Sequence, residues 1–249
     1  MTDGAETTDR ASAFVTTRWS VVLAAQDRAS PEAASALETL CRTYWYPLYA
    51  FVRRQGRTPE DAQDLTQAFF EKFLEKDYLF AAAREKGRFR TFLLVALKRF
   101  LANEWDRSRR LKRGGGLTPV PFDTAIAERR YGAEPPTPTS SADRIFERRW
   151  AMTLLETALA RLRAEYVGHG KGDEFDSLKE CLTAARGEIA YDRLAAGLGL
   201  TEGAARVAVH RLRKRFRELF RATVADTVSV PAEVDDELRH VASILSQGV

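Results

Sequence analysis

The chain has 249 residues, of which 45% are hydrophobic and 30% are charged, and its formal net charge at pH 7 is +4. This composition is that of a folded globular protein, and its longest apolar runs are far shorter than the roughly 18 residues that span a bilayer. Two cysteines without a CxxC spacing argue against a disulfide framework or a zinc site, and no secretory signal pattern opens the chain, so we expect a cytoplasmic protein without a membrane segment.

The charges are unevenly distributed along the chain. Residues 84–113 hold eleven lysines and arginines against three acids, and residues 201–221 hold seven against two. Residues 59–77 carry six acids against two lysines, and the chain after residue 225 carries five acids against one arginine. Separate basic and acidic segments favour one polyanionic partner and one basic partner.

Helical periodicity dominates the first half of the chain. A helix is expected to start at Ser30 and Pro31 and to be kinked or broken at Pro47. A second begins at residue 58, where Thr58 can cap it. A third begins near Phe89. The second helix is expected to bury Ala62, Leu65, Phe69 and Phe73, and the third to bury Phe92, Leu93, Ala96, Leu97, Phe100 and Leu101.

Residues 114–142 contain three consecutive glycines, then TPVPF and EPPTPTSSA, a composition typical of a flexible linker. No alternating strand pattern occurs anywhere in the sequence. The prediction is therefore an all-α protein with two small helical domains joined by an extended linker. Residues 1–29 form an N-terminal extension, 30–113 the first domain, 114–142 the linker, 143–228 the second domain and 229–249 an acidic C-terminal tail.

Residues 191–216, YDRLAAGLGLTEGAARVAVHRLRKRF, have the spacing of a helix-turn-helix. Ala195 stands where two crossing helices would touch, Gly199 supplies the turn and Thr201 can cap the second helix. Such a helix can lie in the major groove of DNA, although a solvated basic surface is the alternative. It carries an apolar stripe (Ala205, Val209, Leu212, Phe216, Leu219) beside a row of basic residues (Arg206, His210, Arg213, Arg217).

The order of these segments resembles the sigma-70 family of bacterial transcription initiation factors, in its compact extracytoplasmic-function type. The likeness covers residues 36–228. YWYPLYAFVRRQGRTPEDAQDLTQAFFEKFL resembles regions 2.1 and 2.2, FRTFLLVALKRFLANEWDRSRRLKRGGG resembles regions 2.3 and 2.4, and the helix-turn-helix resembles region 4.2. Membership would imply a factor that binds core RNA polymerase and directs transcription initiation at promoters.

The resemblance assigns DNA contacts to both basic segments. Lys86, Arg88 and Phe89 would surround a flipped base of the minus-ten element, although core packing is the alternative for Phe89. Because Arg99, Asn103 and Ala208 depart from the residues common in the family, base preference cannot be transferred. Arg99 and Asn103 would face the strand, Arg107, Arg109, Arg110, Lys112 and Arg113 would hold its backbone, and Glu202, Arg206, Val207, His210, Arg211, Arg213, Lys214 and Arg217 would bind the minus-thirty-five element.

The acidic helix from residue 59 would bind the basic clamp helices of the largest polymerase subunit, with the linker threading the polymerase channel. Gln63 replaces an acidic residue of the family pattern. This loss motivates the hypothesis that phosphorylation of Thr66 restores negative charge, the alternative being an ordinary helix threonine. The candidate contacts are Asp61, Asp64, Leu65, Gln67 and Phe70, of which Leu65 could instead be a core residue.

The sequence contains no recognisable catalytic constellation, so we expect no enzymatic activity, no cofactor and no metal. The expected partners are core RNA polymerase and promoter DNA, with an anti-sigma factor or a Ser/Thr kinase as further candidates. Two alternatives remain, an autonomous helix-turn-helix regulator and an adaptor that binds polymerase without reading promoters. The tail places Val234, Leu238, Val241 and Leu245 at helical spacing, and it could cover a domain face or act as a regulatory flap.

Overall fold

The computed structural model describes residues 31–73, 88–110, 124–133, 141–185, 187–228 and 231–246. These ranges contain helices and no strand, so the predicted all-α class is confirmed. None of their helices is long and apolar enough to cross a membrane. In chain order the elements are α2 (Pro31–Arg54), α3 (Pro59–Phe73), α5 (Phe89–Arg110), α6 (Thr124–Ala133), α7 (Ala142–Gly168), α8 (Gly172–Leu178), the 3-10 turn η1 (Lys179–Leu182), α9 (Tyr191–Leu198), α10 (Glu202–Ala225), the 3-10 turn η2 (Pro231–Glu233) and α11 (Val234–Ser246).

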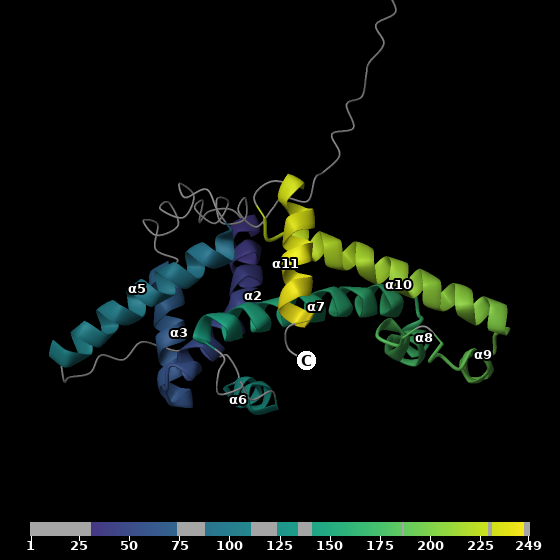
Figure 1. Ribbon diagram of the computed structural model, residues 1–249, viewed down its shortest axis with the longest axis horizontal. Helices are drawn as coiled ribbons and strands as arrows, with labels where there is room; N and C mark the ends of the chain where they lie inside the picture. Colours follow the sequence, from purple (N-terminus) through teal and green to yellow (C-terminus); the bar gives the residue numbers. More distant parts are fainter. Residues whose placement is uncertain are drawn as a thin grey trace, which may run out of the picture.

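The long helix α7 connects the two ends of the molecule (Figure 1). Helices α2, α3, α5 and α6 gather at its N-terminal side, and α8 and α9 lie beyond its C-terminal half. Helix α10 runs back beside α7 toward the centre, where α11 crosses both of them. Helices from both halves of the chain therefore pack against one shared helix, α7.

Side-chain caps fix where several helices begin. The Thr58 hydroxyl accepts from the Asp61 backbone N–H at 3.1 Å, which confirms the predicted cap of α3. Ser141 caps α7 in the same way, through the Arg144 N–H at 3.3 Å. Pro47 does not end α2, because the helix continues to Arg54.

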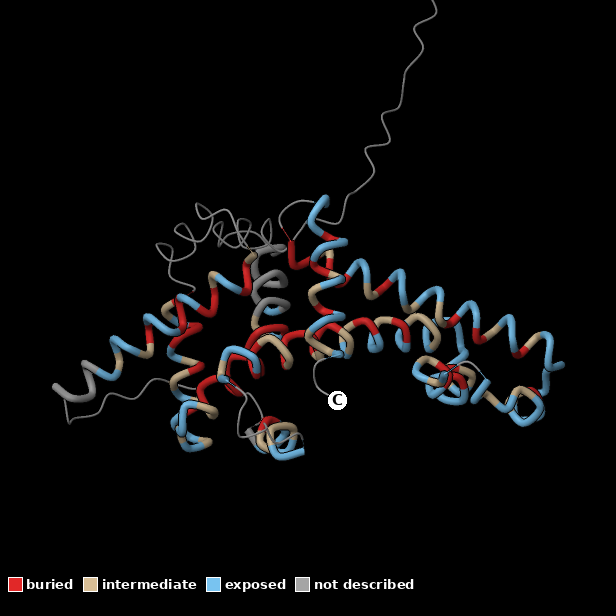
Figure 2. The backbone as a smooth tube through the Cα atoms, viewed as in Figure 1, coloured by how far each residue is buried: buried red, intermediate tan, exposed pale blue. Residues whose placement is uncertain are grey.

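Two hydrophobic clusters form the core, and Figure 2 shows the buried positions running along α7 from one to the other. The first joins aromatic residues of α2, α3 and α5 to Phe146 and Trp150 in the N-terminal half of α7. It also includes Val224 of α10 and Val241 of α11. The second joins Ala158 and Leu162 of α7 to residues of α8 and α10. Because α7 and α10 contribute to both clusters, the division into two domains at residue 143 stays a prediction.

The predicted linker is wrong in part, because residues 124–133 form helix α6. Ala127 is buried in the first cluster, and the Glu128 carboxylate accepts from Arg53 Nε at 2.7 Å and from the Tyr49 hydroxyl. The Arg130 guanidinium lies 4.2 Å from the centre of the Tyr46 ring. The proline-rich composition did not reveal this short helix, since buried contacts and ion pairs with α2 stabilise it rather than its own propensity.

Candidate nucleic-acid and polymerase interfaces

Helices α9 and α10 form the predicted helix-turn-helix. Gly199 ends α9 with φ 63°, a left-handed conformation that costs a residue with a β-carbon free energy. Thr201 then caps α10 by accepting from the Ala204 N–H at 3.2 Å. Ala195 and Ala205 are buried where the helices face one another. The local geometry of the motif is thus the one that its sequence predicts.

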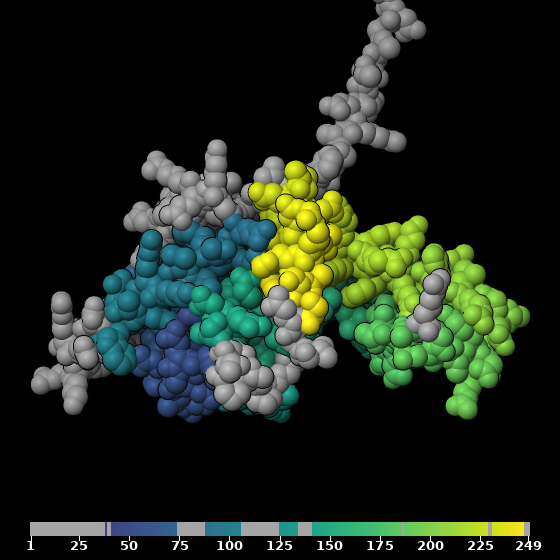
Figure 3. Space-filling view, viewed as in Figure 1, coloured from purple at the N-terminus to yellow at the C-terminus, as the bar shows by residue number. Residues whose placement is uncertain are grey.

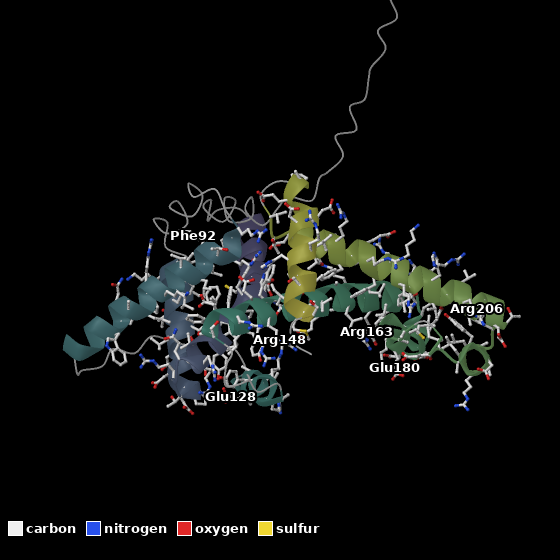
Figure 4. All side chains as sticks on the ribbon, in the orientation of Figure 1. Phe92, Glu128, Arg148, Arg163, Glu180 and Arg206 are labelled. Carbon is white, nitrogen blue, oxygen red and sulfur yellow. The ribbon has the colours of Figure 1, made fainter. Side chains whose placement is uncertain are left out.

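The outer surface of α10 presents most of the predicted DNA contacts to solvent. Arg211, Lys214 and Arg217 have no ion-pair partner among the described residues. Arg206 lies at the end of α10 farthest from α11 (Figure 4), with its guanidinium 4.2 Å from the centre of the Tyr191 ring. We call the solvent-exposed outer surface of α10 the α10 basic face. Its exposed members are Glu202, Arg206, Val207, His210, Arg211, Lys214 and Arg217.

A groove of about 950 Å³ borders the α10 basic face, between α10 and the turn that joins α7 to α8. Val207 and Arg211 line its α10 wall, and Glu165, Asp173 and Glu174 line the other. His169 and Lys171 also line the groove, Glu174 pairs with Lys171 and Glu165 pairs with Arg215, so the groove is mixed in charge.

Arg213, one of the predicted DNA contacts, is held by backbone carbonyls of the protein itself. Its guanidinium donates to the carbonyl oxygens of Cys181 at 2.8 Å and Ala184 at 2.6 Å, so it satisfies the end of the η1 turn. Arg213 follows Val209 by four residues and therefore lies toward the buried side of α10. That spacing could have identified it as a structural arginine.

Helix α5 presents some of its predicted minus-ten residues and hides others. Arg99 and Asn103 are exposed, as the predicted contact requires. Phe89 is wrong as a stacking platform in this conformation, because it is 1% exposed and packs edge-on against Tyr44 and Phe73. The side chains of Arg107, Arg109 and Arg110, and the whole of residues 86, 112 and 113, lie outside the described residues.

Helix α3 exposes its acids and buries part of the predicted polymerase surface. Asp61 and Asp64 are exposed, and Gln67 donates to Glu71 at 3.2 Å. Leu65 packs against the first cluster, which agrees with its alternative assignment as a core residue. Phe70 is wrong as an exposed apolar contact, because it is 6% exposed in the first cluster. Helices α2, α5 and α6 all contact α3, so its buried side is wider than one stripe.

The structure argues against phosphorylation of Thr66. The residue is completely buried, and its hydroxyl donates to the Ala62 carbonyl at 2.7 Å. A phosphate there would be shielded from solvent, which is costly for a charged group. The hypothesis placed Thr66 on the clamp-facing surface, but Thr66 follows Ala62 and precedes Phe73 on the core side of α3.

Sequence reasoning missed a group of charged residues where α5, α7 and α11 meet. Arg90 is 3% exposed, and its Nε donates to Glu147 at 3.0 Å. Burial lowers the pKa of Arg90, while Glu147 opposes that shift. Arg90 lies in the first turn of a basic helix, so nothing in the sequence indicated that its side chain is buried.

The described residues contain no group of three or more His, Cys, Asp or Glu that could hold a metal. The expectation of no metal, no cofactor and no catalysis stays a prediction. No family model, curated protein or solved structure matches this chain. The likeness to sigma factors therefore depends on the motifs and on the geometry described above.

Proposed function

We propose that this protein is a sigma factor, which binds core RNA polymerase, recognises promoter minus-ten and minus-thirty-five elements and directs transcription initiation in the cytoplasm. The observation that carries the proposal is the α10 basic face on a complete helix-turn-helix. A capped helix with exposed cations along one side suits the major groove and its phosphates. The exposed acids of α3 and the exposed Arg99 and Asn103 of α5 supply surfaces for polymerase and for the minus-ten strand.

An autonomous helix-turn-helix regulator is the second candidate. It is favoured by the burial of Phe70 and Phe89, since two residues that the sigma assignment needs at the surface lie in the core. Such a regulator needs only α9 and α10 to be accessible.

Transcription in vitro separates the two candidates. A library of promoter fragments is transcribed by purified core polymerase with and without the protein, and start sites are mapped. Discrete start sites that depend on the protein are the expected result. Binding of duplex DNA without any initiation would reject the sigma assignment and leave the regulator.

The α10 basic face is expected to bind phosphate through Lys214 and Arg217. Replacing both by alanine should lower affinity for duplex DNA about equally for all sequences, and should reduce the slope of log K against log salt by about 0.9 per lost contact. Fluorescence anisotropy at several salt concentrations measures both quantities.

Arg215 provides the matched control on the same helix. Its guanidinium is exposed, but it is held by Glu165 at 2.6 Å and by Glu218 at 2.9 Å. Arg215→Ala should therefore leave the salt slope unchanged. A slope that falls by the same amount per removed cation in this variant would mean that the net charge of α10, and not its outer surface, determines binding.

A further inference from the structure

Helix α11 brings a buried carboxylate against two arginines of α5. The Glu237 side chain is 1% exposed and forms ion pairs with Arg90 and, at 3.1 Å, with Arg88 Nε. Glu147 of α7 contacts Arg90 from the other side and also lies 3.2 Å from His240 of α11. In the space-filling view α11 lies between the visible surfaces of α5 and α10 (Figure 3). A single helix thus joins the two parts of the chain assigned to DNA.

The ion pairs of Glu237 are incompletely satisfied. Both carboxylate oxygens are buried, and neither accepts a hydrogen bond within the described part of the chain. A buried charge held by ionic attraction alone recovers only part of its desolvation cost. Glu237 and Arg90 depend on one another, because loss of either charge would leave its buried partner poorly compensated.

The rest of the α11 attachment combines apolar contacts with ion pairs to α7 and α10. Val234 and Val241 are its buried apolar residues, and Leu238, Ile244 and Leu245 are partly buried. Its exposed residues are mostly polar and include Asp235, which pairs with Arg221. Helix α11 is the last element that the structure describes.

Arg88 and Arg90 form a site suited to an anion. They flank the first residue of α5, a 22-residue helix whose first turn contains no acid. Helix N-termini favour negative charge, and two guanidinium groups bind carboxylate or phosphate oxygens through charge-assisted hydrogen bonds. Glu237 is the anion present in this conformation.

We propose that α11 is an autoinhibitory segment whose Glu237 carboxylate occupies a phosphate site formed by Arg88 and Arg90. A phosphate of single-stranded DNA takes that site when α11 detaches. The identity of the anion as DNA depends on the proposed function. By linkage, DNA binding and α11 docking then oppose one another to the same extent.

Glu237→Gln removes the competing charge with little change in side-chain shape. The variant is expected to bind a labelled single-stranded oligodeoxynucleotide of mixed sequence about tenfold more tightly than the unchanged chain, which corresponds to a docked population of about 90%. Arg88→Gln combined with Glu237→Gln should abolish the gain. Asp236→Asn is the matched control, since it removes one carboxylate from the same helix at an exposed pair within α11. An equal gain in the control would overturn the proposal.

Hydrogen exchange on the unchanged protein tests the same competition without any substitution. Addition of the oligodeoxynucleotide should speed amide exchange in residues 234–246, and unchanged or slower exchange there would overturn the proposal. The two proposals fail separately. If the protein does not support initiation by core polymerase, the sigma assignment is rejected. If initiation occurs but α11 stays docked when DNA binds, only the autoinhibition proposal is rejected.

Discussion

Replacement of Trp150 by alanine is expected to lower the free energy of unfolding by about 3–5 kcal/mol. Trp150 is completely buried in the first cluster, and the Arg90 guanidinium lies 4.5 Å from the centre of its ring. The truncation leaves a cavity and removes the cation–π contact of a buried arginine. Urea unfolding followed by far-UV circular dichroism measures the loss as a lower midpoint at constant slope.

Trp105 is the control of the same residue type. It is 49% exposed near the end of α5, and its ring lies 5.0 Å from the Arg57 guanidinium. Trp105→Ala should cost about 1 kcal/mol or less, as surface substitutions and exposed cation–π contacts usually do. Equal losses at the two positions would contradict the packing described for α7.

The Trp150→Phe variant distinguishes the contribution of aromatic packing from that of the buried indole N–H. The Nε1 group of Trp150 is buried without a hydrogen-bond acceptor in the described residues. Phenylalanine removes that unsatisfied donor, which offsets part of the lost packing. The variant should therefore retain clearly more stability than Trp150→Ala.

Features set by neighbouring residues could be predicted from the sequence. Thr58 and Thr201 cap their helices as expected, because a cap needs only a hydroxyl and an N–H three residues later. Gly199 adopts the left-handed conformation that the turn requires. The fold class and the helix-turn-helix followed from such local chemistry.

Features set by packing between distant segments could not be predicted. Thr66 follows Ala62 by four residues, so helical spacing alone could have placed it in the core. Phe70 looks like a surface residue if α3 buries one stripe, but α2, α5 and α6 all contact α3 and Phe70 is buried. Glu237 lies in an acidic segment that reads as a solvated tail, and only its position beside Arg88 and Arg90 shows that it is buried. The α6 helix likewise depends on Arg53 and Tyr49, more than 70 residues earlier in the chain.

The surface of α3 provides the second large expected effect. Asp61 and Asp64 are three residues apart on a helix and both are exposed, so their carboxylates can face one basic partner. Replacing both by lysine reverses two charges at that surface. Affinity for core polymerase is expected to fall by about 100-fold or more, because like charges placed together at an interface cost several kcal/mol. Binding of labelled protein to purified core polymerase measures the change.

The control must change the net charge equally elsewhere. Asp176 and Glu180 are exposed acids at the far end of α7, on α8 and η1, and Figure 4 labels Glu180 there. Lysine at both positions alters the total charge as much as the α3 substitutions do. Retained polymerase affinity in this control, with loss in the α3 variant, would place the contact on α3. Equal losses would show that long-range charge governs association, and the assignment of α3 as a polymerase-binding helix would then be withdrawn.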